Sequence, residues 1–450
     1  MSLLAYQKLK PSVVEYLDEI PNDWPLKRLG DIVGFAQGKA HEPYIDDDGD
    51  YICVNSRFVS TSGKTIKTCS LNLTPASLND ILMVMSDLPN GRALARAYYV
   101  ADHGKYAVNQ RVCRITAEKA HPRFLFYVLD RHPGLMQNDD GVHQTHLSNA
   151  DFQKLKIYLP SISEQTQIAG FLDHETARID ALIEEQQRLI ELLKEKRQAV
   201  ISHAVTKGLD PTVPMKDSDV EWLGEVPCSW RVIKFGITHD KAELGGNYEA
   251  GESEEGLPLI KMGNIGRGKV KLDKVEYVSL TQDIDSGHTL KEGDFLFNTR
   301  NSLDLVGKVC VWRSELYAAL YNSNILRISF NKSFVGSSGF VNYLLNSNLG
   351  LEQLRLIARG TTSVAAIYYK DLSSLSFAFP SPSEQREIER FLDIQTSQLD
   401  ALVSAAEQTV DVIKERRSAL ISAAVTGKID VRGWQPPARV QSPELAQEAV

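Results

Sequence analysis

The sequence predicts an α/β (α+β) protein in which two mixed α/β domains are joined by two long helices, with an internal pseudo-twofold repeat. Three observations predict this fold class: a long helix-like segment occurs twice, a shorter lead-in occurs twice, and the two blocks between them share an order of strand-like runs. At 450 residues the chain is long enough for two or more domains, each with its own core.

The helix-like segment is the clearest repeat. It reads PSISEQTQIAGFLDHETARIDALI from Pro160 and PSPSEQREIERFLDIQTSQLDALV from Pro380. At a shift of 220 residues, residues 159–210 and 379–430 share about 23 identities in 52 positions without a gap. A helix of about 40 residues would be roughly 60 Å long.

Residues typical of helix ends flank both copies. Ser163 and Ser383 follow a proline-bearing stretch and precede a glutamate, so we expect them to cap the helices at their N-termini. Gly208 and Gly427 follow the last apolar residues, where a glycine commonly ends a helix.

Apolar residues recur at seven-residue steps in both copies, which predicts amphipathic helices with coiled-coil-like packing. The expected coiled-coil positions are Leu172, Ile179, Leu182, Leu193 and Val200 in the first copy, and Leu392, Leu399, Leu402, Ile413 and Leu420 in the second. A companion track is expected on Ile168, Leu182 and Leu189, widened by Ile183 and Ile190. One helix cannot cover its own apolar stripe, so we expect the two helices to pair.

A lead-in precedes each block. KPSVVEYLDEIPNDW, residues 10–24, aligns without gaps on KDSDVEWLGEVPCSW, residues 216–230. Within the blocks, YICVNSRF resembles LPLIKMGNI, NDILM resembles GDFLF, and VNQRVCRI resembles YNSNILRI. These runs are rich in β-forming residues and are separated by Gly, Asn and Asp turns, which predicts a small irregular sheet in each block. Helices are expected over residues 122–137 and 339–358.

These repeats divide the chain into five segments. They are residues 1–158 (lead-in and first block), 159–210 (first helix), 211–378 (lead-in and second block), 379–430 (second helix) and 431–450 (a C-terminal tail).

Composition narrows the class of protein. No apolar run approaches the length of a membrane span, and the N-terminus lacks a signal-peptide pattern, so we expect a cytoplasmic protein without a membrane partner. The five cysteines are scattered without ligand spacing, which indicates reduced thiols and no metal site. The net charge is −8, yet residues 51–131 carry about +6 and residues 295–360 about +4, so basic patches lie between acidic helices.

Motifs of catalysis are missing. GNIGRGKV, residues 263–270, has the spacing of a phosphate-binding loop, but Val270 replaces the metal-binding hydroxyl and the next residues alternate as a strand does, so a β-hairpin turn is expected. No methyl-donor loop, flipped-adenine tetrapeptide or nuclease metal motif occurs. We therefore expect no catalytic residues and no chemistry performed by this chain.

Both blocks instead carry residue types that contact phosphates and read base edges. The first-block candidates for DNA contact are Arg57, Lys64, Lys67, Arg92, Arg96, Lys105, Gln110, Arg111, His143, Gln144 and Thr145. The second-block candidates are Lys261, Asn264, Arg267, Lys269, Lys271, Thr299, Arg300, Asn301, Thr361, Thr362, Ser363, Tyr368, Tyr369 and Lys370. For each single residue an ordinary solvated role is the alternative, so the prediction concerns the two sets.

These motifs, in this order, resemble the specificity (S) subunits of type I restriction–modification enzymes. The resemblance covers nearly the whole chain. It rests on the paired helix segments and lead-ins, on the endings KEKRQAVISHAVT and KERRSALISAAVT, and on the block-internal pieces GDFLFNTRN and GTTSVAAIYYKDL.

The resemblance implies that each block is a target-recognition domain reading one half of an asymmetric bipartite site in double-stranded DNA. It implies that the helices form an antiparallel coiled coil, which sets the spacing and docks two methyltransferase (M) subunits. Adenine methylation with S-adenosylmethionine would belong to M, and cleavage driven by ATP with Mg²⁺ to restriction (R) subunits, so this chain would bind no cofactor.

Two alternatives from other classes stay open. One is a self-contained restriction enzyme with unrecognisable catalytic motifs, and the other is a coiled-coil adaptor that binds only protein. Under the S-subunit hypothesis, replacing residues 141–147 or 360–372 alters one half-site alone. Insertions within residues 184–192 or 404–412 change only the gap between the half-sites.

Overall fold

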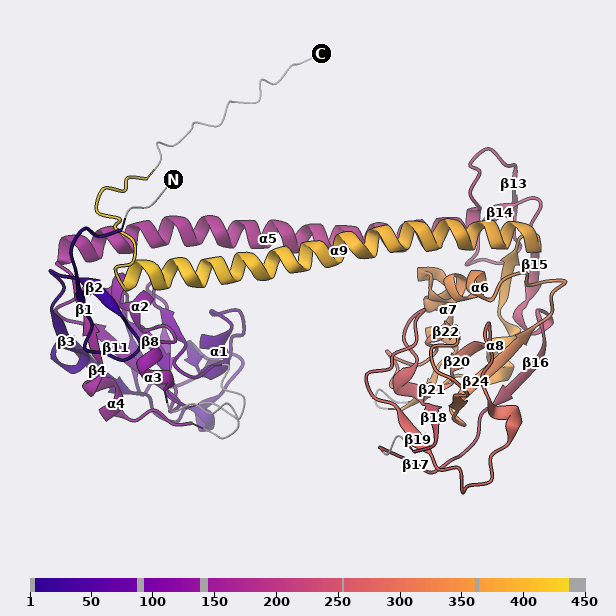
Figure 1. The fold of residues 1–450 in the computed structure, drawn as a ribbon, viewed down its shortest axis with the longest axis horizontal. Helices are drawn as coiled ribbons and strands as arrows, with labels where there is room; N and C mark the ends of the chain where they lie inside the picture. Colours follow the sequence, from indigo (N-terminus) through magenta and orange to yellow (C-terminus); the bar gives the residue numbers. More distant parts are fainter. Residues whose placement is uncertain (1–4, 87–92, 138–144, 253–254, 361–363, 437–450) are drawn as a thin grey trace, which may run out of the picture. The chain divides into compact units, whose positions relative to one another are not determined.

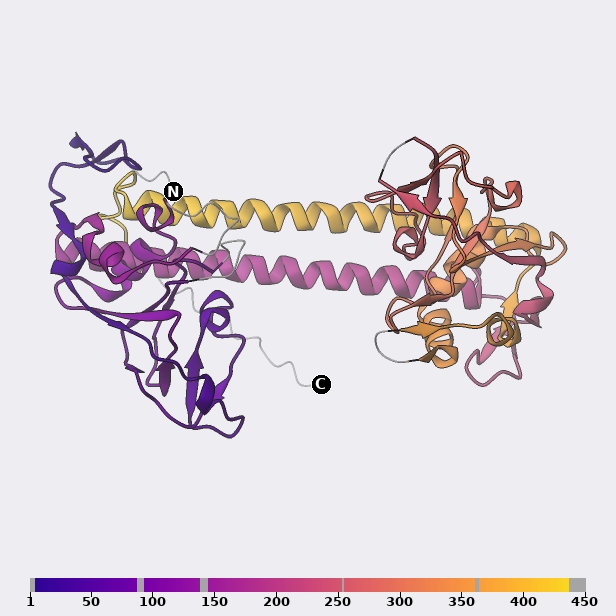
Figure 2. The same cartoon turned by 90° about the horizontal axis from the view of Figure 1, so that it is seen from below.

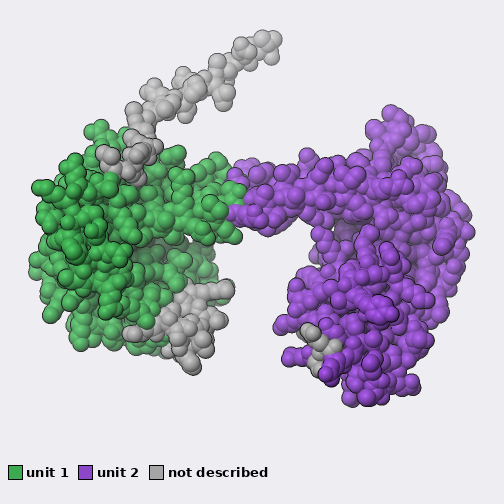
Figure 3. All heavy atoms as spheres, viewed as in Figure 1, with its two compact units in different colours: residues 1–185, 409–450 green, residues 186–408 purple. Residues whose placement is uncertain are grey.

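The computed structural model describes residues 5–86, 93–137, 145–252, 255–360 and 364–436 (Figure 1). Contacts divide the chain into two compact units: unit 1 consists of residues 1–185 and 409–450, and unit 2 of residues 186–408 (Figure 3). Each unit contains one α/β block and part of both long helices. The predicted fold class is confirmed.

Unit 1 starts with a hairpin of β1 (Leu9–Pro11) and β2 (Glu19–Pro21), and β3 (Leu26–Arg28) pairs with β12 (Lys156–Tyr158). One four-stranded sheet has the order β4-β11-β8-β9 (Val33–Gln37, Val112–Ala117, Ile81–Val84, Ala97–Tyr99). The other has the order β6-β5-β10-β7 (Thr68–Cys69, Tyr51–Val54, Tyr106–Val108, Pro75–Ala76). The short helices are α1 (Ser56–Ser60), α2 (Pro122–Leu129), α3 (Pro133–Met136) and α4 (Asn149–Lys154), with 3₁₀ turns at Leu29–Asp31 and Glu42–Tyr44.

Unit 2 repeats this plan with a hairpin of β13 (Met215–Asp217) and β14 (Glu225–Pro227), and with β15 (Arg231–Lys234) paired to β27 (Ser376–Phe379). Its sheets have the orders β16-β24-β20-β22 (His239–Leu244, Ile325–Phe330, Phe295–Asn298, Val309–Val311) and β17-β19-β18-β23 (Ala250–Gly251, Glu276–Val278, Leu257–Ile260, Leu320–Tyr321). A third sheet is β21-β26-β25 (Arg300–Asn301, Ala365–Ala366, Arg359–Gly360). The helices are α6 (Ser338–Asn346), α7 (Asn348–Ile357) and α8 (Tyr369–Ser374), with 3₁₀ turns at Phe235–Ile237, Met262–Asn264 and Ser286–His288.

The two predicted short helices are each broken in two. In residues 122–137, Arg131 adopts φ +53° and Pro133 starts α3, so α2 ends at Leu129. In residues 339–358, the Ser347 hydroxyl accepts the Gly350 N–H at 3.1 Å and caps a new helix. Local capping therefore overrides an apolar pattern that continues through both breaks.

The long helices are α5 (Ile162–Lys207) and α9 (Pro382–Val425). The expected N-caps are wrong by two residues. The hydroxyls of Ser161 and Ser381 accept the N–H groups of Glu164 and Glu384, both at 3.3 Å, so Ser163 and Ser383 lie inside the helices. The expected helix stops are confirmed, because Gly208 and Gly427 have φ +81° and +69°, in the left-handed region that glycine favours.

In each unit, part of α5 lies antiparallel beside part of α9 (Figures 1 and 2). In unit 1, Arg417 Nε donates to Asp180 Oδ1 at 2.8 Å, and in unit 2, Arg197 Nε donates to Asp400 Oδ1 at 2.7 Å. These ion pairs are related by the internal repeat. The sequence prediction that the helices pair is therefore confirmed within each unit.

One track of the predicted coiled-coil core is wrong. Leu182 and Leu402 are 44% and 54% exposed, and Leu189 is also exposed. Buried or half-buried side chains instead occupy positions 179, 183, 186, 190, 193, 197 and 200 of α5, and positions 399, 403, 406, 410, 413, 417 and 420 of α9. Both tracks have the same seven-residue period, so the sequence pattern alone does not choose between them.

The lead-ins hold the starts of the long helices. Trp24 is buried, and its Nε1 donates to Glu164 Oε1 at 3.2 Å. Trp230 is buried in the same way and donates to Glu384 Oε1 at 2.9 Å. A tryptophan in each lead-in thus pairs with the first-turn glutamate of each helix, which explains why both segments repeat together.

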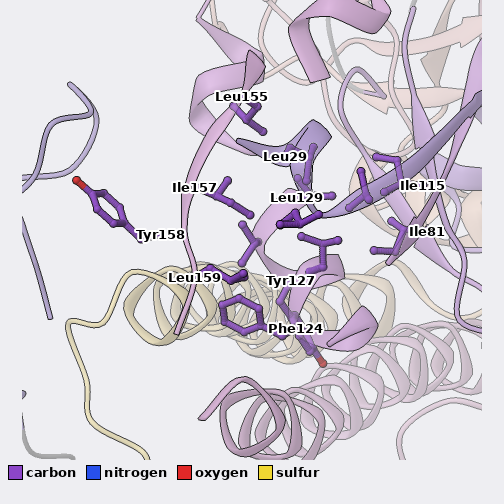
Figure 4. Close-up of a cluster of buried hydrophobic side chains, with 14 of the residues drawn as sticks. Leu29, Ile81, Ile115, Phe124, Tyr127, Leu129, Leu155, Ile157, Tyr158 and Leu159 are labelled. Atoms are coloured by element: carbon purple, nitrogen blue, oxygen red, sulfur yellow. The ribbon is translucent and has the colours of Figure 1, made fainter. Parts of the chain in front are cut away.

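The core of unit 1 joins the sheet to α5. Phe124 and Leu129 of α2 and Ile81 and Ile115 of the sheet belong to one buried cluster (Figure 4), which also contains Leu172 of α5. In unit 2 the corresponding cluster includes Phe295, Ile328, Phe340, Leu345 and Leu392. Ala424 of α9 also belongs to the unit 1 cluster, and Ile201 of α5 to the unit 2 cluster, so burial of these side chains fastens each block to both long helices.

His132, between α2 and α3, makes unit 1 sensitive to acid. Its Nδ1 accepts the Gly134 N–H at 3.1 Å, and burial lowers the pKa of His132 to about 4. An unfolded chain, whose histidine pKa is near 6.5, binds a proton that the folded chain excludes. The free energy of unfolding should therefore fall by about 3 kcal/mol as the pH drops from 6.5 to 4.

The variant His132→Asn keeps an acceptor for the Gly134 N–H but has no titratable group. Urea unfolding at pH 7 and pH 4.5 should show that the free energy of unfolding falls less between these pH values in this variant than in the parent protein. Equal falls in the two proteins would contradict the role assigned to His132.

Candidate nucleic-acid interface

A groove of about 270 Å³ in unit 1 brings together four of the predicted DNA-contact residues. They are Arg57 of α1, Lys67 before β6, and Gln110 and Arg111 in the turn between β10 and β11. All four side chains are exposed. Three cations and an amide on one groove match the residue types that hold phosphates and read bases.

Asparagines make the groove rigid. Asn55 Oδ1 accepts the Phe58 N–H at 2.9 Å and starts α1, which carries Arg57. Asn109 Oδ1 accepts the Gln110 N–H at 2.7 Å, and Asn109 Nδ2 donates to Glu42 Oε1 at 2.9 Å. That hydrogen bond is the main cause that lowers the pKa of Glu42, so Glu42 is a carboxylate at neutral pH. A carboxylate in a basic groove can accept a hydrogen bond from a cytosine amino group.

The other described first-block candidates lie outside this groove. Lys64 is exposed, Arg96 pairs with Asp130 at 3.6 Å, and Lys105 pairs with Asp50 at 3.7 Å. Thr145 lies in the loop before α4. The candidates Arg92, His143 and Gln144 lie outside the described residues.

In unit 2, the three-stranded sheet brings together two candidate segments. Arg300 and Asn301 of β21 pair with Ala366 and Ala365 of β26, which leads directly to Tyr368. Tyr368, Tyr369 and Lys370 are exposed, although the Tyr369 hydroxyl also lies 2.9 Å from His239 Nε2. Thr299 Oγ1 donates to the Asn324 carbonyl at 2.8 Å. The candidates Thr361, Thr362 and Ser363 lie outside the described residues.

Four cations gather next to this sheet. Arg267 and Lys271 come from the turn around the Ile265–Val270 bridge, which confirms the expected hairpin. Lys308 precedes β22, and Arg355 lies on α7. Partial burial, and then the charge of Arg355, lowers the pKa of Arg267; partial burial, and then the charges of Lys271 and Arg267, lowers the pKa of Lys308. We call Arg267, Lys271, Lys308 and Arg355 the four-cation cluster.

The cluster is suited to an anion. In the described part of the chain no carboxylate forms an ion pair with any of its four members. Like charges held close together raise each other's electrostatic energy, and a phosphate placed among them relieves that repulsion.

Three other second-block candidates are engaged inside the protein. Lys261 forms an ion pair with Glu276, and Lys269 Nζ lies 3.5 Å from Asp400 Oδ2. Asn264 is only 6% exposed, and its Nδ2 donates to the Lys271 carbonyl at 2.9 Å. In this conformation Asn264 holds the turn and does not face a ligand.

Comparison with known proteins shows similarity to one family. Residues 21–193 match the family model of the type I restriction modification DNA specificity domain. The type I restriction enzyme MjaVIII specificity subunit of Methanocaldococcus jannaschii is 23% identical over 425 residues, which are 92% of this chain and 94% of that protein. The EcoBI specificity subunit of Escherichia coli is 24% identical over 356 residues, 75% of this chain and 71% of the relative. The chain is therefore similar to type I specificity subunits over most of its length.

A solved structure shares the fold of this chain. It comes from work on the "complex assembly and conformational transition of the type I R-M system". Its matching chain has a TM-score of 0.68 and 18% identity, with 91% of this chain and 99% of that chain covered.

Sequence reasoning missed four residues of the two surfaces in this chain. Lys308 and Arg355 fall in a basic segment that the charge count detects, but nothing in the sequence places them beside Arg267. Asn55 and Asn109 each follow a strand-like run, which is a signal for a capping or turn residue. Long-range folding, and not local pattern, decides which of these side chains meet.

Other classes of site are not seen in the described ranges. There, no group of three or more His, Cys, Asp or Glu side chains gathers as a metal ion would require, and all five cysteines are free thiols. Among the described helices, none is both long and apolar enough to cross a membrane.

Proposed function

We propose that this chain is the DNA-reading subunit of a type I restriction–modification complex, and that each unit reads one half of an asymmetric bipartite site. The observation that carries this proposal is that both units contain a four-stranded sheet with the same strand order but carry different basic surfaces. Unit 1 has the groove around Arg57 and Arg111, and unit 2 has the four-cation cluster beside β21-β26-β25. Two units that share this sheet but differ in their basic surfaces favour two different half-sites.

Exposed apolar side chains on the helices support docking of two identical partners. Leu182 and Val412 are 44% and 63% exposed in unit 1, and Leu402 and Leu192 are 54% and 52% exposed in unit 2. The internal repeat relates Leu182 to Leu402 and Leu192 to Val412. Each unit therefore offers an equivalent apolar pair, which suits one methyltransferase subunit per unit.

In this proposal the paired helices set the spacing of the half-sites, and catalysis belongs to the partners. The methyltransferase subunits use S-adenosylmethionine on an adenine that is flipped out of the duplex. Restriction subunits use ATP and Mg²⁺ for translocation and cleavage. This chain is non-catalytic and binds none of these cofactors, but both methylation and restriction require it because it selects the site.

Co-expression of the chain with the methyltransferase encoded beside it tests the proposal. Single-molecule sequencing of host DNA should reveal N6-methyladenine in a two-part, asymmetric motif with a fixed gap. A purified complex that methylates no site would contradict the proposal. A complex that shows no salt-dependent DNA binding either would favour a protein-only adaptor, and cleavage by the chain alone would favour a self-contained restriction enzyme.

A further inference from the structure

The helix of the first block is held on α5 by a tyrosine hydroxyl. Tyr127 of α2 donates to Asp173 Oδ1 at 2.7 Å, and its oxygen lies 3.2 Å from Thr176 Oγ1. The Thr176 hydroxyl also donates to the Leu172 carbonyl at 2.6 Å, which fixes its rotamer. Tyr127 and Thr176 are both buried. Burial is the main cause that raises the pKa of Tyr127 to about 12, so the hydroxyl keeps its proton at neutral pH.

The second block repeats this contact. Tyr343 of α6 donates to Asp393 Oδ1 at 2.7 Å and lies 3.1 Å from Thr396 Oγ1. Asp393 and Thr396 are the repeat equivalents of Asp173 and Thr176. The two tyrosines come from helices of otherwise different sequence, PRFLFYVL and SGFVNYLLN, which share only a Phe-x-x-Tyr spacing and apolar residues after it.

A glutamine makes a second repeated attachment. Gln165 Oε1 accepts the N–H of His121, the N-cap of α2, at 2.7 Å. Gln385 Oε1 accepts the N–H of Gly336, just before α6, at 2.9 Å. Both glutamines are fully buried. Gln165 and Asp173 are eight residues apart, roughly 12 Å along the helix. Two fixed points at this separation prevent the block from pivoting on either one.

We propose that the Ser-x-x-Glu-Gln and Asp-x-x-Thr residues shared by both long helices are attachment sites for the recognition blocks, and that Tyr127 and Tyr343 are positioning residues which fix how each block is set on its helix. This inference rests on the proposed function, because positioning matters only if the blocks read two half-sites at a fixed gap.

The proposal separates two surfaces of the same helices. The polar residues Gln165, Asp173 and Thr176 face the block of their own unit, whereas the exposed apolar side chains Leu182 and Val412 contact no core cluster. The two helix copies then share the same residues at the polar positions because both blocks attach there, and not because the methyltransferase binds there. A block that reads a new sequence can be accommodated as long as it presents a tyrosine at this position.

The test uses the co-expressed complex with its methyltransferase and the bipartite target found by sequencing. Tyr127→Phe and Tyr343→Phe remove one hydroxyl each and leave ring packing intact. Methylation rates are measured on duplexes with the native gap, with one base pair more and with one base pair fewer. The gap ratio is the methylation rate on the native gap divided by the rate on an altered gap. It should fall about threefold in each single variant and about tenfold in the double variant. Discrimination against single base changes within a half-site should stay unchanged.

Two controls distinguish positioning from general stability. Tyr317→Phe changes a tyrosine that is 96% exposed in unit 2 and should leave the gap ratio unchanged. Asp393→Asn retains an oxygen acceptor for Tyr343, so its gap ratio should stay close to that of the parent complex. If Tyr343→Phe fails to assemble, Thr396→Val, which removes the weaker contact, must lower the ratio in the same direction.

Three outcomes would overturn the inference. They are an unchanged gap ratio in the assembled double variant, an unchanged ratio in assembled Thr396→Val where Tyr343→Phe does not assemble, and a loss of base discrimination instead of gap discrimination. Absence of any methylation by the parent complex would instead contradict the proposed function, so the two failures are distinguishable.

Discussion

The double variant Lys308→Glu and Arg355→Glu is expected to bind DNA about a hundredfold more weakly than the parent complex in about 0.1 M salt. Both side chains belong to the four-cation cluster, in which Lys308 already carries a lowered pKa from burial and from the neighbouring cations Lys271 and Arg267. Each phosphate contact contributes about one unit to the slope of log affinity against log salt. Loss of two contacts should therefore reduce that slope by about 2.

The same variant should be as stable as the parent protein, or more stable, because two cations in a like-charge cluster are replaced by anions. A variant that binds DNA more weakly without losing stability indicates that the cluster is a binding site, since loss of a structural site would lower stability as well. The double variant Lys234→Glu and Lys332→Glu makes the same charge change at two exposed sites of unit 2, so it is the matched control and should cost less than threefold in affinity. Equal losses for the control and the cluster variant would show that only net charge matters.

A seven-residue insertion in each long helix is expected to lengthen the recognised gap by about 3 base pairs without changing either half-site. Duplication of residues 186–192 in α5 and of residues 406–412 in α9 adds two helical turns, roughly 10 Å, and base pairs are about 3.4 Å apart. Seven residues also preserve the spacing of the core positions, so the helices still pair. Sequencing of methylated host DNA measures the new gap directly.

Insertion into α5 alone is the matched control. It leaves the core positions of one helix without partners, so the complex should unfold at lower temperature or lose methylation. This expectation differs from the one drawn from the sequence, that an insertion in one helix changes only the gap, because the structure pairs the two helices. A four-residue insertion in both helices shifts the apolar positions by half a heptad and should also destabilise the pair. A recognised gap that stays at its original length in a stable double-duplication variant would contradict the spacing role of the helices.

Much of the fold follows from local pattern. The repeated helices, the lead-ins and the strand-like runs were all predictable because each depends on residues near one another in the chain. The exceptions are informative. Arg131 and Pro133 break one predicted helix and Ser347 breaks the other, because a cap or a proline outweighs apolar periodicity over a few residues.

The candidate DNA surfaces were predictable only as sets of residues. Arg57, Lys67, Gln110 and Arg111 do meet in one groove, since three short segments next to the neighbouring strands β5, β6 and β10 carry them. Asn264 was a reasonable candidate by type, but its amide is used by the turn that surrounds it. Residue type predicts what a side chain can bind, whereas its neighbours in the fold decide whether it is free to bind.

The sequence by itself determined that this chain has two blocks on two equivalent helices and that basic charge lies in the blocks, because repeats, periodicity and charge are properties of the order of residues. Only the tertiary structure decided that Ile183 and Ile190 face the helix partner while Leu182 and Leu189 face outward. It also decided that Arg267, Lys308 and Arg355 form one cluster. The physical reason is the same in both cases: a seven-residue period and a local charge count are compatible with several arrangements, and long-range packing selects one of them.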